Sequence, residues 1–242
     1  MEQHADPVPV RSADSTGITG NVGMTDGGNG IDSAKTALRH RAFAARRAMD
    51  AADRERYGQA LAPFASDLLA MARGCAHGCA GERTPETSPV VAAFVSMGTE
   101  PPMGALLEAL LDAGARLLVP RLGAGRDLGW AWLGGLDDLR DMGERRPREP
   151  QAGTLPADAM RSVDLVVMPA LGIDPNGNRL GRGGGWYDRM LALRAPGTPA
   201  VAVVYPWERM DGSALPHAPH DMPVDATLTD AGISPCGHHG GR

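Results

Sequence analysis

The hydrophobic positions of this chain change their spacing along the sequence, and each change marks the start of an expected element. Residues 34–49 carry apolar side chains at helical spacing, with Leu38 and Ala42 on the inner face and Ser33 placed to cap the first turn. A second helix is expected over residues 53–72, whose apolar positions recur at the same spacing. The amino-terminal part of the fold should therefore be helical.

Short apolar runs of strand length follow these helices, and further helices separate several of them. Strands are expected at residues 90–97, 116–119, 130–133, 165–168, 200–205 and 226–229. A helix between the first two strands, ending at Gly114, favours a right-handed crossover and parallel pairing. The expected fold class is α/β, with three layers and a mostly parallel sheet between flanking helices. Ligands should then bind at the carboxyl ends of the strands.

Neither end of the chain shows such a pattern. Residues 1–32 are rich in Gly, Asp, Ser and Thr and are expected to form a disordered tail, and residues 234–242 are expected to form a flexible one. One domain is therefore expected over residues 33–233. The chain has 242 residues, of which 43% are hydrophobic, and this is enough for one substantial core.

The composition limits the cellular locations and the binding partners that can be expected for the protein. No apolar run of about 7–15 residues follows a basic start, and none approaches the roughly 20 residues of a membrane span. The net charge of −5 gives no reason to expect nucleic acid binding. Cys75, Cys79 and Cys236 are too few for a disulfide framework, and Cys75, His77 and Cys79 have no fourth metal ligand nearby. We expect a cytoplasmic monomer that binds neither membrane nor nucleic acid.

The segment after the strand at residues 165–168 is rich in glycine and leads into another expected helix. Its glycines are Gly172, Gly177, Gly181, Gly183, Gly184 and Gly185. Glycine allows positive φ and close approach of the backbone, so successive N–H groups can converge on an anion just ahead of a helix. Arg179, Arg182 and Arg189 add positive charge, and Asp188 adds a carboxylate that can reach a cation on bound phosphates. The segment therefore predicts a phosphate-binding loop.

Two common phosphate motifs do not fit this loop. The Walker pattern needs Gly-Lys-Ser/Thr, which does not occur, and the dinucleotide pattern G-x-G-x-x-G needs glycine where Trp186 stands. The order of residues instead resembles the motif D-x-x-G-x-R-L-G-x-G-x-G-x-Y-D-R of the 5-formyltetrahydrofolate cyclo-ligase family, also called methenyltetrahydrofolate synthetases. The matching residues are Asp174, Gly177, Arg179, Leu180, Gly181, Gly183, Gly185, Tyr187, Asp188 and Arg189.

The resemblance extends over about residues 33–233. Similar segments are VSMGTEPP at residues 95–102, LLVPRL at residues 117–122, Glu149-Pro150, and HDMPVDATLTDAGI at residues 220–233. The departures are small: Trp186 stands where the family usually has Tyr, and Gly184 stands where some members have Lys. The second departure removes one possible phosphate contact and would shift more of that task to Lys35 and Arg182.

The resemblance implies ATP- and Mg²⁺-dependent cyclisation of 5-formyltetrahydrofolate to 5,10-methenyltetrahydrofolate, with release of ADP and phosphate through a phosphorylated formyl intermediate. By resemblance, Lys35 and Arg182 would be catalytic, and Asp188 and Asp221 would hold Mg²⁺. Folate would be bound by Val95, Glu100, Trp186 and Tyr187, although packing of the loop explains Trp186 and Tyr187 equally well. ATP would be bound by Lys35, Arg39, Gly181, Arg182, Gly183, Gly184, Gly185, Trp186, Tyr187, Asp188 and Arg189.

One compositional fact supports a role for Lys35. It is the sole lysine among the 24 basic residues, which suggests that a compact ammonium is wanted at this position. Arg39 lies four residues further on, so a helix places the two cations one above the other. A solvated basic face is the alternative interpretation. The similar K-x-x-L-R helix at the start of the cyclo-ligases, whose basic residues contact the nucleotide, favours the functional one.

Two other classes of function stay open at this point. A sugar-phosphate isomerase or CoA transferase of comparable α/β architecture would use the glycine loop for phosphate, but would not require paired Mg²⁺ carboxylates or Lys35 with Arg39. A non-catalytic folate- or nucleotide-binding paralogue should have lost one of Lys35, Arg39, Asp188 and Asp221. All four are present, which favours the active enzyme.

Overall fold

The computed structural model of the protein describes residues 27–74, 88–122, 128–143, 146–210, 212 and 214–237. Residues 1–26 of the expected amino-terminal tail lie outside these ranges, as do Cys75, His77 and Cys79. Among the helices in the described ranges, none combines the length and the apolar character needed to cross a membrane.

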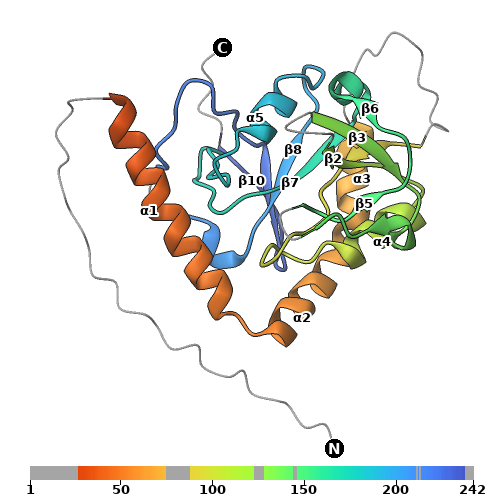
Figure 1. Ribbon diagram of the computed structural model, residues 1–242, viewed down its shortest axis with the longest axis horizontal. Helices are drawn as coiled ribbons and strands as arrows, with labels where there is room; N and C mark the ends of the chain where they lie inside the picture. Colours follow the sequence, from red (N-terminus) through yellow and green to blue (C-terminus); the bar gives the residue numbers. More distant parts are fainter. Residues whose placement is uncertain are drawn as a thin grey trace, which may run out of the picture.

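A sheet forms the middle layer of the protein (Figure 1). Its eight strands are β1 Val90–Ala92, β2 Arg116–Leu122, β3 Leu128–Leu133, β6 Leu155–Pro156, β7 Leu165–Pro169, β8 Ala200–Val203, β9 Ala226–Thr229 and β10 Gly232–Pro235. Strands β9, β8, β7, β1 and β2 run parallel in this spatial order. Antiparallel strands flank them, with β10 beside β9 at one edge and β3 followed by β6 beside β2 at the other.

Both faces of the sheet are covered, so its central strands are apolar on both faces. Val167 and Val201 point into one core, whereas Val166 and Met168 point into the other, as the two-residue period of a strand requires. The first face is covered by α2 Ala51–Leu61, α3 Ala65–Gly74 and α4 Gly104–Asp112. The second face is covered by the 3-10 helix η3 Ala157–Ser162 and by α5 Trp186–Leu191. The expected three-layer α/β fold is thus confirmed.

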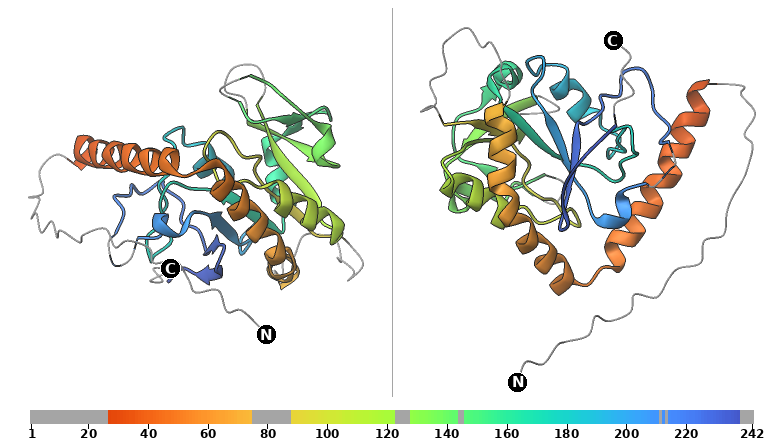
Figure 2. Two further views of the ribbon diagram at one scale, coloured as in Figure 1. Left: turned by 90° about the horizontal axis from the view of Figure 1, so that it is seen from below. Right: turned by 180° about the vertical axis from the view of Figure 1, so that it is seen from behind.

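Helix α1, Gly27–Ala48, extends beyond these layers (Figure 2). It packs on loops, where Phe43 contacts a small buried cluster of Leu171, Leu180 and Leu215. Leu171 and Leu180 belong to the segment that follows β7, so α1 lies beside the carboxyl end of a central strand. The helix is therefore placed where α/β proteins bind their ligands.

The first helix begins earlier than the apolar pattern predicted. It starts at Gly27, so Ser33 lies inside the helix and is not its cap, and residues 27–32 are helical instead of disordered. These residues include Gly27, Gly28 and Gly30, which are poor helix formers and give no helical signal. The predicted start of the helix was set by its first apolar residues, whereas the helical backbone begins several residues before them.

The expected second helix at residues 53–72 is two helices. A 3-10 turn at Ala62–Phe64 separates α2 from α3 and contains Pro63. Proline has no backbone N–H and clashes with the preceding helical turn, so the ladder of hydrogen bonds is interrupted there. The apolar spacing continues through the interruption because both helices cover the same face of the sheet.

Several other bounds also differ from expectation. Strands β2 and β3 are longer than the strands expected at residues 116–119 and 130–133, and β8 ends at Val203 instead of residue 205. The strand expected at residues 90–97 ends at Ala92, and the chain then enters a loop in which the Ser96 hydroxyl donates to the Pro101 carbonyl over 2.6 Å. At the carboxyl end, β10 continues to Pro235, inside the tail predicted for residues 234–242, because it pairs with β9. The polar stretch after β3 contains a separate antiparallel pair, β4 Leu139–Arg140 with β5 Glu149–Pro150.

Candidate active site

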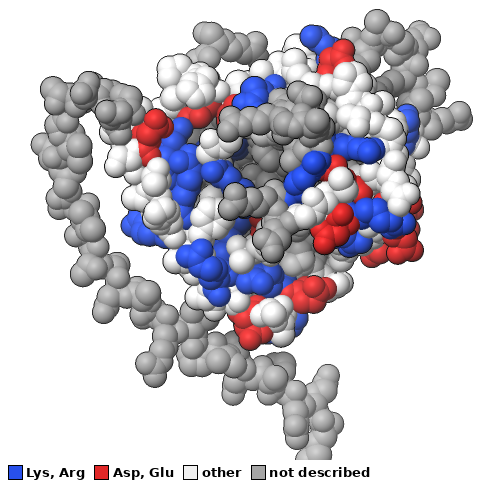
Figure 3. Space-filling view, viewed as in Figure 1, with Lys and Arg blue, Asp and Glu red and all other residues white. Residues whose placement is uncertain are grey.

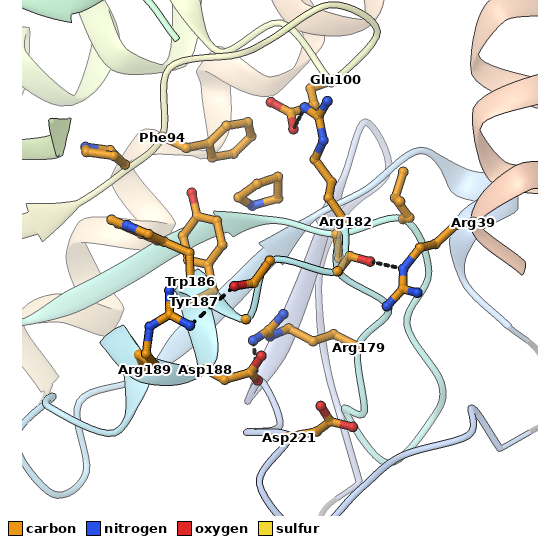
Figure 4. Close-up of a pocket in the computed structure, with 18 of the residues that line it drawn as sticks. Arg39, Phe94, Glu100, Arg179, Arg182, Trp186, Tyr187, Asp188, Arg189 and Asp221 are labelled. Atoms are coloured by element: carbon orange, nitrogen blue, oxygen red, sulfur yellow. Dashed lines mark hydrogen bonds and ion pairs between the residues drawn. The ribbon is translucent and has the colours of Figure 1, made fainter. Parts of the chain in front are cut away.

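A cavity of about 830 Å³ opens at the carboxyl ends of the central strands (Figure 4). Val95 follows β1, Pro120 lies in β2 and Pro169 ends β7, and all three line it. In the space-filling view of Figure 3, Lys and Arg side chains lie around the middle of the face. Every predicted site residue lines this one cavity: Lys35, Arg39, Val95, Glu100, Gly181, Arg182, Gly183, Gly184, Gly185, Trp186, Tyr187, Asp188, Arg189 and Asp221.

The glycine loop needs glycine at several of its positions. Gly183 and Gly185 have φ angles of 101° and 59°, and Gly185 precedes the first residue of α5 in the left-handed conformation. Gly177 has a φ of 83°, and a Cβ there would lie 2.2 Å from the Val224 carbonyl oxygen. The motif glycines therefore allow both the turns of the loop and its close contact with the segment before β9.

Asp174 holds the start of this loop in place. Its side chain is buried and accepts hydrogen bonds from the backbone N–H groups of Asn176 and Asn178, each over 2.9 Å, and of Leu215 over 3.0 Å. The Asn178 side chain donates a further bond over 2.9 Å. A buried carboxylate needs such a set of donors. The motif aspartate is thus a structural residue of the loop and does not line the cavity.

Helix α1 brings two cations to the cavity. Lys35 forms an ion pair with Asp221. The Arg39 Nε donates to the Gly181 carbonyl over 2.8 Å (Figure 4). Lys35 is only 8% exposed, so the alternative of a solvated basic face is wrong for this residue. Burial raises the pKa of the Asp221 carboxyl, but the hydrogen bonds from Lys35 and from the Ala218 N–H outweigh it and hold that pKa below its usual value.

The second predicted metal carboxylate, Asp188, also has a cationic partner. One of its oxygens lies 2.5 Å from the Arg179 Nη2 and accepts from the Met222 N–H over 3.1 Å. Figure 4 shows Asp188 and Asp221 toward one end of the cavity, away from Glu100. No group of three or more Asp, Glu, His or Cys side chains suited to a metal occurs in the described ranges, so a metal here would depend on these two carboxylates and the ligand.

Glu100 marks the other end of the cavity. Its carboxylate is buried, accepts from the Met97 N–H over 2.9 Å and lies 3.2 Å from the Arg182 Nη1. Arg182 belongs to the glycine loop, and half of its side chain is exposed. The Glu100 carboxylate therefore contacts the glycine loop at the point where the aromatic side of the cavity begins.

Aromatic side chains form that wall. The Trp186 and Tyr187 rings are 4.7 Å apart and nearly perpendicular, and Trp186 also contacts Trp130, with ring centres 5.1 Å apart. Both Trp186 and Tyr187 pack against the core and line the cavity, so the two interpretations of these residues are compatible. Burial, and to a lesser extent the Glu100 charge, raises the pKa of the Tyr187 hydroxyl well above its usual value. This hydroxyl therefore stays protonated and can donate a hydrogen bond.

Other residues line the cavity that were not assigned to the site. Phe94 adds to the aromatic wall, and Arg179 contributes a buried guanidinium, although it had been noted only for its charge. Arg46 lines the cavity as well. In the sequence, Arg46 stands seven residues after Arg39, and residues spaced by two helical turns share a face. This spacing could have indicated that Arg46 also faces the site.

Comparison with known proteins agrees with this architecture. The structures of two methenyltetrahydrofolate synthetases have a similar fold. The one from Aquifex aeolicus has a TM-score of 0.64 at 23% identity and covers 86% of this chain and 94% of its own. The one from Mycoplasma pneumoniae has a TM-score of 0.57 at 18% identity and covers 81% of this chain and 98% of its own. The fold is thus that of an α/β protein like these synthetases.

The sequence comparisons give the family. A model of the 5-formyltetrahydrofolate cyclo-ligase family matches residues 31–230. The 5-formyltetrahydrofolate cyclo-ligase of Mycolicibacterium smegmatis is 39% identical over 142 residues, which cover 57% of this chain and 72% of that protein. The chain belongs to the 5-formyltetrahydrofolate cyclo-ligase family, and the resemblance seen in its motifs is confirmed.

Proposed function

We propose that this protein catalyses the ATP- and Mg²⁺-dependent cyclisation of 5-formyltetrahydrofolate to 5,10-methenyltetrahydrofolate, releasing ADP and phosphate. Membership of the family supports the reaction. The observation that carries the proposal for this chain is that all its predicted site residues, drawn from segments far apart in the sequence, line one cavity. That cavity has a basic, glycine-rich end and an aromatic end, which suits a nucleotide beside a folate.

The basic end would bind the ATP phosphates. Lys35, Arg39 and Arg182 all reach the cavity around the loop at residues 181–185. Arg179 adds a buried guanidinium whose Nε has no hydrogen-bond partner within the described part of the chain. Phosphoryl transfer depends mainly on positioning and on neutralising the charge of the transferred group, and a cluster of cations around a narrow loop provides both.

Asp188 and Asp221 would hold Mg²⁺. Carboxylate oxygens are suitable ligands, and Mg²⁺ is commonly bound by one or two carboxylates together with substrate phosphates and waters. When bound, the ion would supply positive charge to the phosphate oxygens. Each carboxylate is paired with a cation, Asp188 with Arg179 and Asp221 with Lys35. ATP would draw these two cations toward its phosphates and leave both carboxylates available.

The chemistry requires activation of a poor leaving group. The formyl oxygen would attack the γ-phosphorus, so that a carbon-bound oxygen gains the phosphoryl group and the bond to ADP breaks. The folate N10 would then attack the formyl carbon, lose its proton, and expel phosphate to close the ring. We assign to Lys35 and Arg182 the stabilisation of the phosphoryl group during its transfer, since both are cationic, both line the cavity, and Arg182 belongs to the glycine loop.

The aromatic end would bind the folate. Glu100 would accept hydrogen bonds from the pterin, and Val95, Trp186 and Tyr187 would enclose its ring. The indole Nε1 of Trp186 is buried and without a hydrogen-bond partner in the described residues, so a bound substrate could provide one. All the predicted site residues come from one chain, so a monomer would be sufficient for activity, and we propose a monomer that acts in the cytoplasm.

An absorbance assay tests the function directly. Purified full-length protein should form methenyltetrahydrofolate from 5-formyltetrahydrofolate only when both ATP and Mg²⁺ are present, with one ADP appearing for each product. Turnover in nucleotide-free, metal-free buffer would overturn the mechanism. Absence of turnover, with binding of folate and ATP intact, would support the non-catalytic paralogue instead. Light scattering of the same sample tests the monomer.

A further inference from the structure

Arg46 and Glu208 form a buried ion pair beside the cavity. The guanidinium donates to both carboxylate oxygens, over 2.6 Å and 2.9 Å, and to the Ala170 carbonyl over 2.5 Å. Both side chains are 1% exposed. The planar guanidinium lies 5.5 Å from the centre of the Tyr205 ring. Its position is thus defined by three hydrogen bonds and one aromatic contact.

The pair joins α1 to the ends of two neighbouring parallel strands. Ala170 directly follows β7, and Glu208 follows β8 in the 3-10 helix η4, Pro206–Glu208. Glu208 is itself held in place, because its Oε2 accepts from the Tyr205 N–H over 3.0 Å and its carbonyl accepts from the Ile173 N–H over 2.9 Å. The carboxylate is therefore a fixed point at the carboxyl edge of the sheet.

Arg46 lies on the same face of α1 as the two cations assigned to ATP. Arg39 precedes it by seven residues and Lys35 by eleven, and both separations return to nearly the same direction around a helix. At 1.5 Å per residue, Arg39 and Lys35 lie about 10 Å and 16 Å along the axis from Arg46. A change in the rotation or slide of α1 at Arg46 would therefore move both cations.

A contribution to the stability of the fold does not by itself explain a buried ion pair at this position. A buried ion pair must overcome the desolvation of two charges, and apolar side chains of similar volume often stabilise a fold as well or better. What the pair provides is direction, since a guanidinium bonded to both carboxylate oxygens permits one orientation. The apolar cluster around Leu171, Leu180 and Leu215 holds α1 against the loops, but apolar contacts are less directional.

We propose that Arg46 and Glu208 are positioning residues that set the rotation and height of α1, and thereby place Lys35 and Arg39 for ATP. The proposal rests on the proposed function for its substrate, but the placement of the helix can be measured without any substrate. Neither residue takes part in the chemistry. Loss of the pair should weaken ATP binding and leave folate binding almost unchanged.

The sole lysine of the chain provides the first measurement. Lys35 is 8% exposed and paired with Asp221, so an amine-acylating reagent should modify it slowly, and mass spectrometry of its peptide separates it from the amino terminus. In the variants Arg46→Met and Glu208→Gln, acylation of Lys35 should be at least about fivefold faster, because a loosened helix exposes it more often. Asp225→Asn is the control, since Asp225 accepts from the Ala200 N–H at the opposite, amino end of β8.

The second measurement separates positioning from stability. The single variants each leave one buried charge unpaired and will lose stability. The double variant Arg46→Met with Glu208→Gln leaves no unpaired charge and keeps an acceptor for Tyr205, so it should fold with a thermal midpoint near that of the wild type. It should nevertheless show a KM for ATP about tenfold higher, with the KM for folate changed by less than about twofold. Isothermal titration with ADP should show the same loss of affinity.

The outcomes are distinct. If Lys35 in the folded double variant is acylated at the same rate as in the wild type, the proposal is overturned. Faster acylation with an unchanged KM for ATP would overturn it as well. A further loss of ATP affinity when Arg46→Met is added to Lys35→Ala with Arg39→Ala would also contradict it, because the pair is to act through those two residues. If the wild type binds no ATP, the proposed function fails, while the acylation rates still decide whether the pair places α1.

Discussion

The Arg182 guanidinium of the glycine loop donates a hydrogen bond to the Glu100 carboxylate, with 3.2 Å between Nη1 and Oε1 (Figure 4). The two residues are separated by 82 positions in the sequence and are assigned to different substrates. Glu100 is buried, whereas Arg182 is half exposed and can leave. If the ATP phosphates attract Arg182, the Glu100 carboxylate becomes free for the pterin.

This relationship predicts coupling between the two substrates. A non-hydrolysable ATP analogue should tighten binding of 5-formyltetrahydrofolate by about fivefold or more, which is within the usual range of coupling between two sites. In Arg182→Met, folate binding without nucleotide should already be tighter and the analogue should add little. Titration calorimetry measures both affinities. The same tightening in wild type and Arg182→Met would show that this hydrogen bond does not couple the sites.

Neutralising either proposed metal carboxylate should weaken the response to Mg²⁺. Asp188→Asn and Asp221→Asn should each lower activity at limiting Mg²⁺ by about tenfold or more, with partial recovery at high Mg²⁺. Asp225→Asn controls for loss of a carboxylate outside the cavity. The measurement is the initial rate over a range of Mg²⁺ concentrations. Full activity of both variants at limiting Mg²⁺ would exclude these residues as ligands.

Replacing Lys35 by arginine should not be conservative. The planar guanidinium is larger than the ammonium and directs its hydrogen bonds differently, and the Lys35 side chain that it would replace is buried. We expect a higher KM for ATP and slower turnover in Lys35→Arg, with Lys35→Ala worse. Steady-state kinetics at several ATP concentrations decide this. ATP kinetics of Lys35→Ala equal to those of the wild type would leave the residue without a role in nucleotide binding.

The ion pair of Lys35 with Asp221 should also contribute to stability in a pH-dependent way. The pKa of Asp221 is lower in the folded protein than its usual value of 3.8, so its contribution is present above that value and is lost as pH falls through the folded pKa. Lys35→Ala should therefore be less stable than the wild type at neutral pH, and the difference should shrink in acid. Thermal unfolding from about pH 5 to about pH 2 tests this, and a difference that stays constant below pH 3.8 would contradict it.

The glycine at position 184 should accept a side chain. Nothing lies within 4 Å of a Cβ built there, unlike at Gly177, where the Val224 carbonyl would be 2.2 Å away. Gly184→Lys should fold normally and lower the KM for ATP by about threefold, because it adds a partly exposed cation beside the phosphates. Gly184→Ala should leave the KM unchanged, whereas Gly177→Ala should lose thermal stability. An unchanged KM in Gly184→Lys would place the phosphates away from this position.

Local patterns in the sequence predicted most of the elements. The strands at residues 165–168 and 226–229 were found within one residue of their observed ends, because apolar runs bounded by polar segments are typical of strands buried on both faces. The bounds at Gly27 and Pro63 were missed, since there the hydrogen bonding of the backbone, and not the apolar spacing, decides where a helix starts or breaks.

The motif predicted which residues belong to the candidate site. Glycines that need positive φ, such as Gly183 and Gly185, stand at fixed spacing within one short segment, and a local sequence can encode such a turn. The same segment identified the family. Residue types alone could not show that Asp174 supports the loop from outside the cavity, because this depends on its contact with Leu215.

Only the tertiary structure decided which charges meet. Lys35 contacts Asp221 across 186 positions, and Arg46 contacts Glu208 across 162. A helical pattern shows that Lys35, Arg39 and Arg46 share a face, but not which carboxylate that face will meet. That choice is made when α1 packs across the loops after β7 and β8, and it depends on the geometry of the whole sheet. Ion pairs between residues distant in sequence form because the fold brings those residues together, so the local spacing of residues cannot predict them.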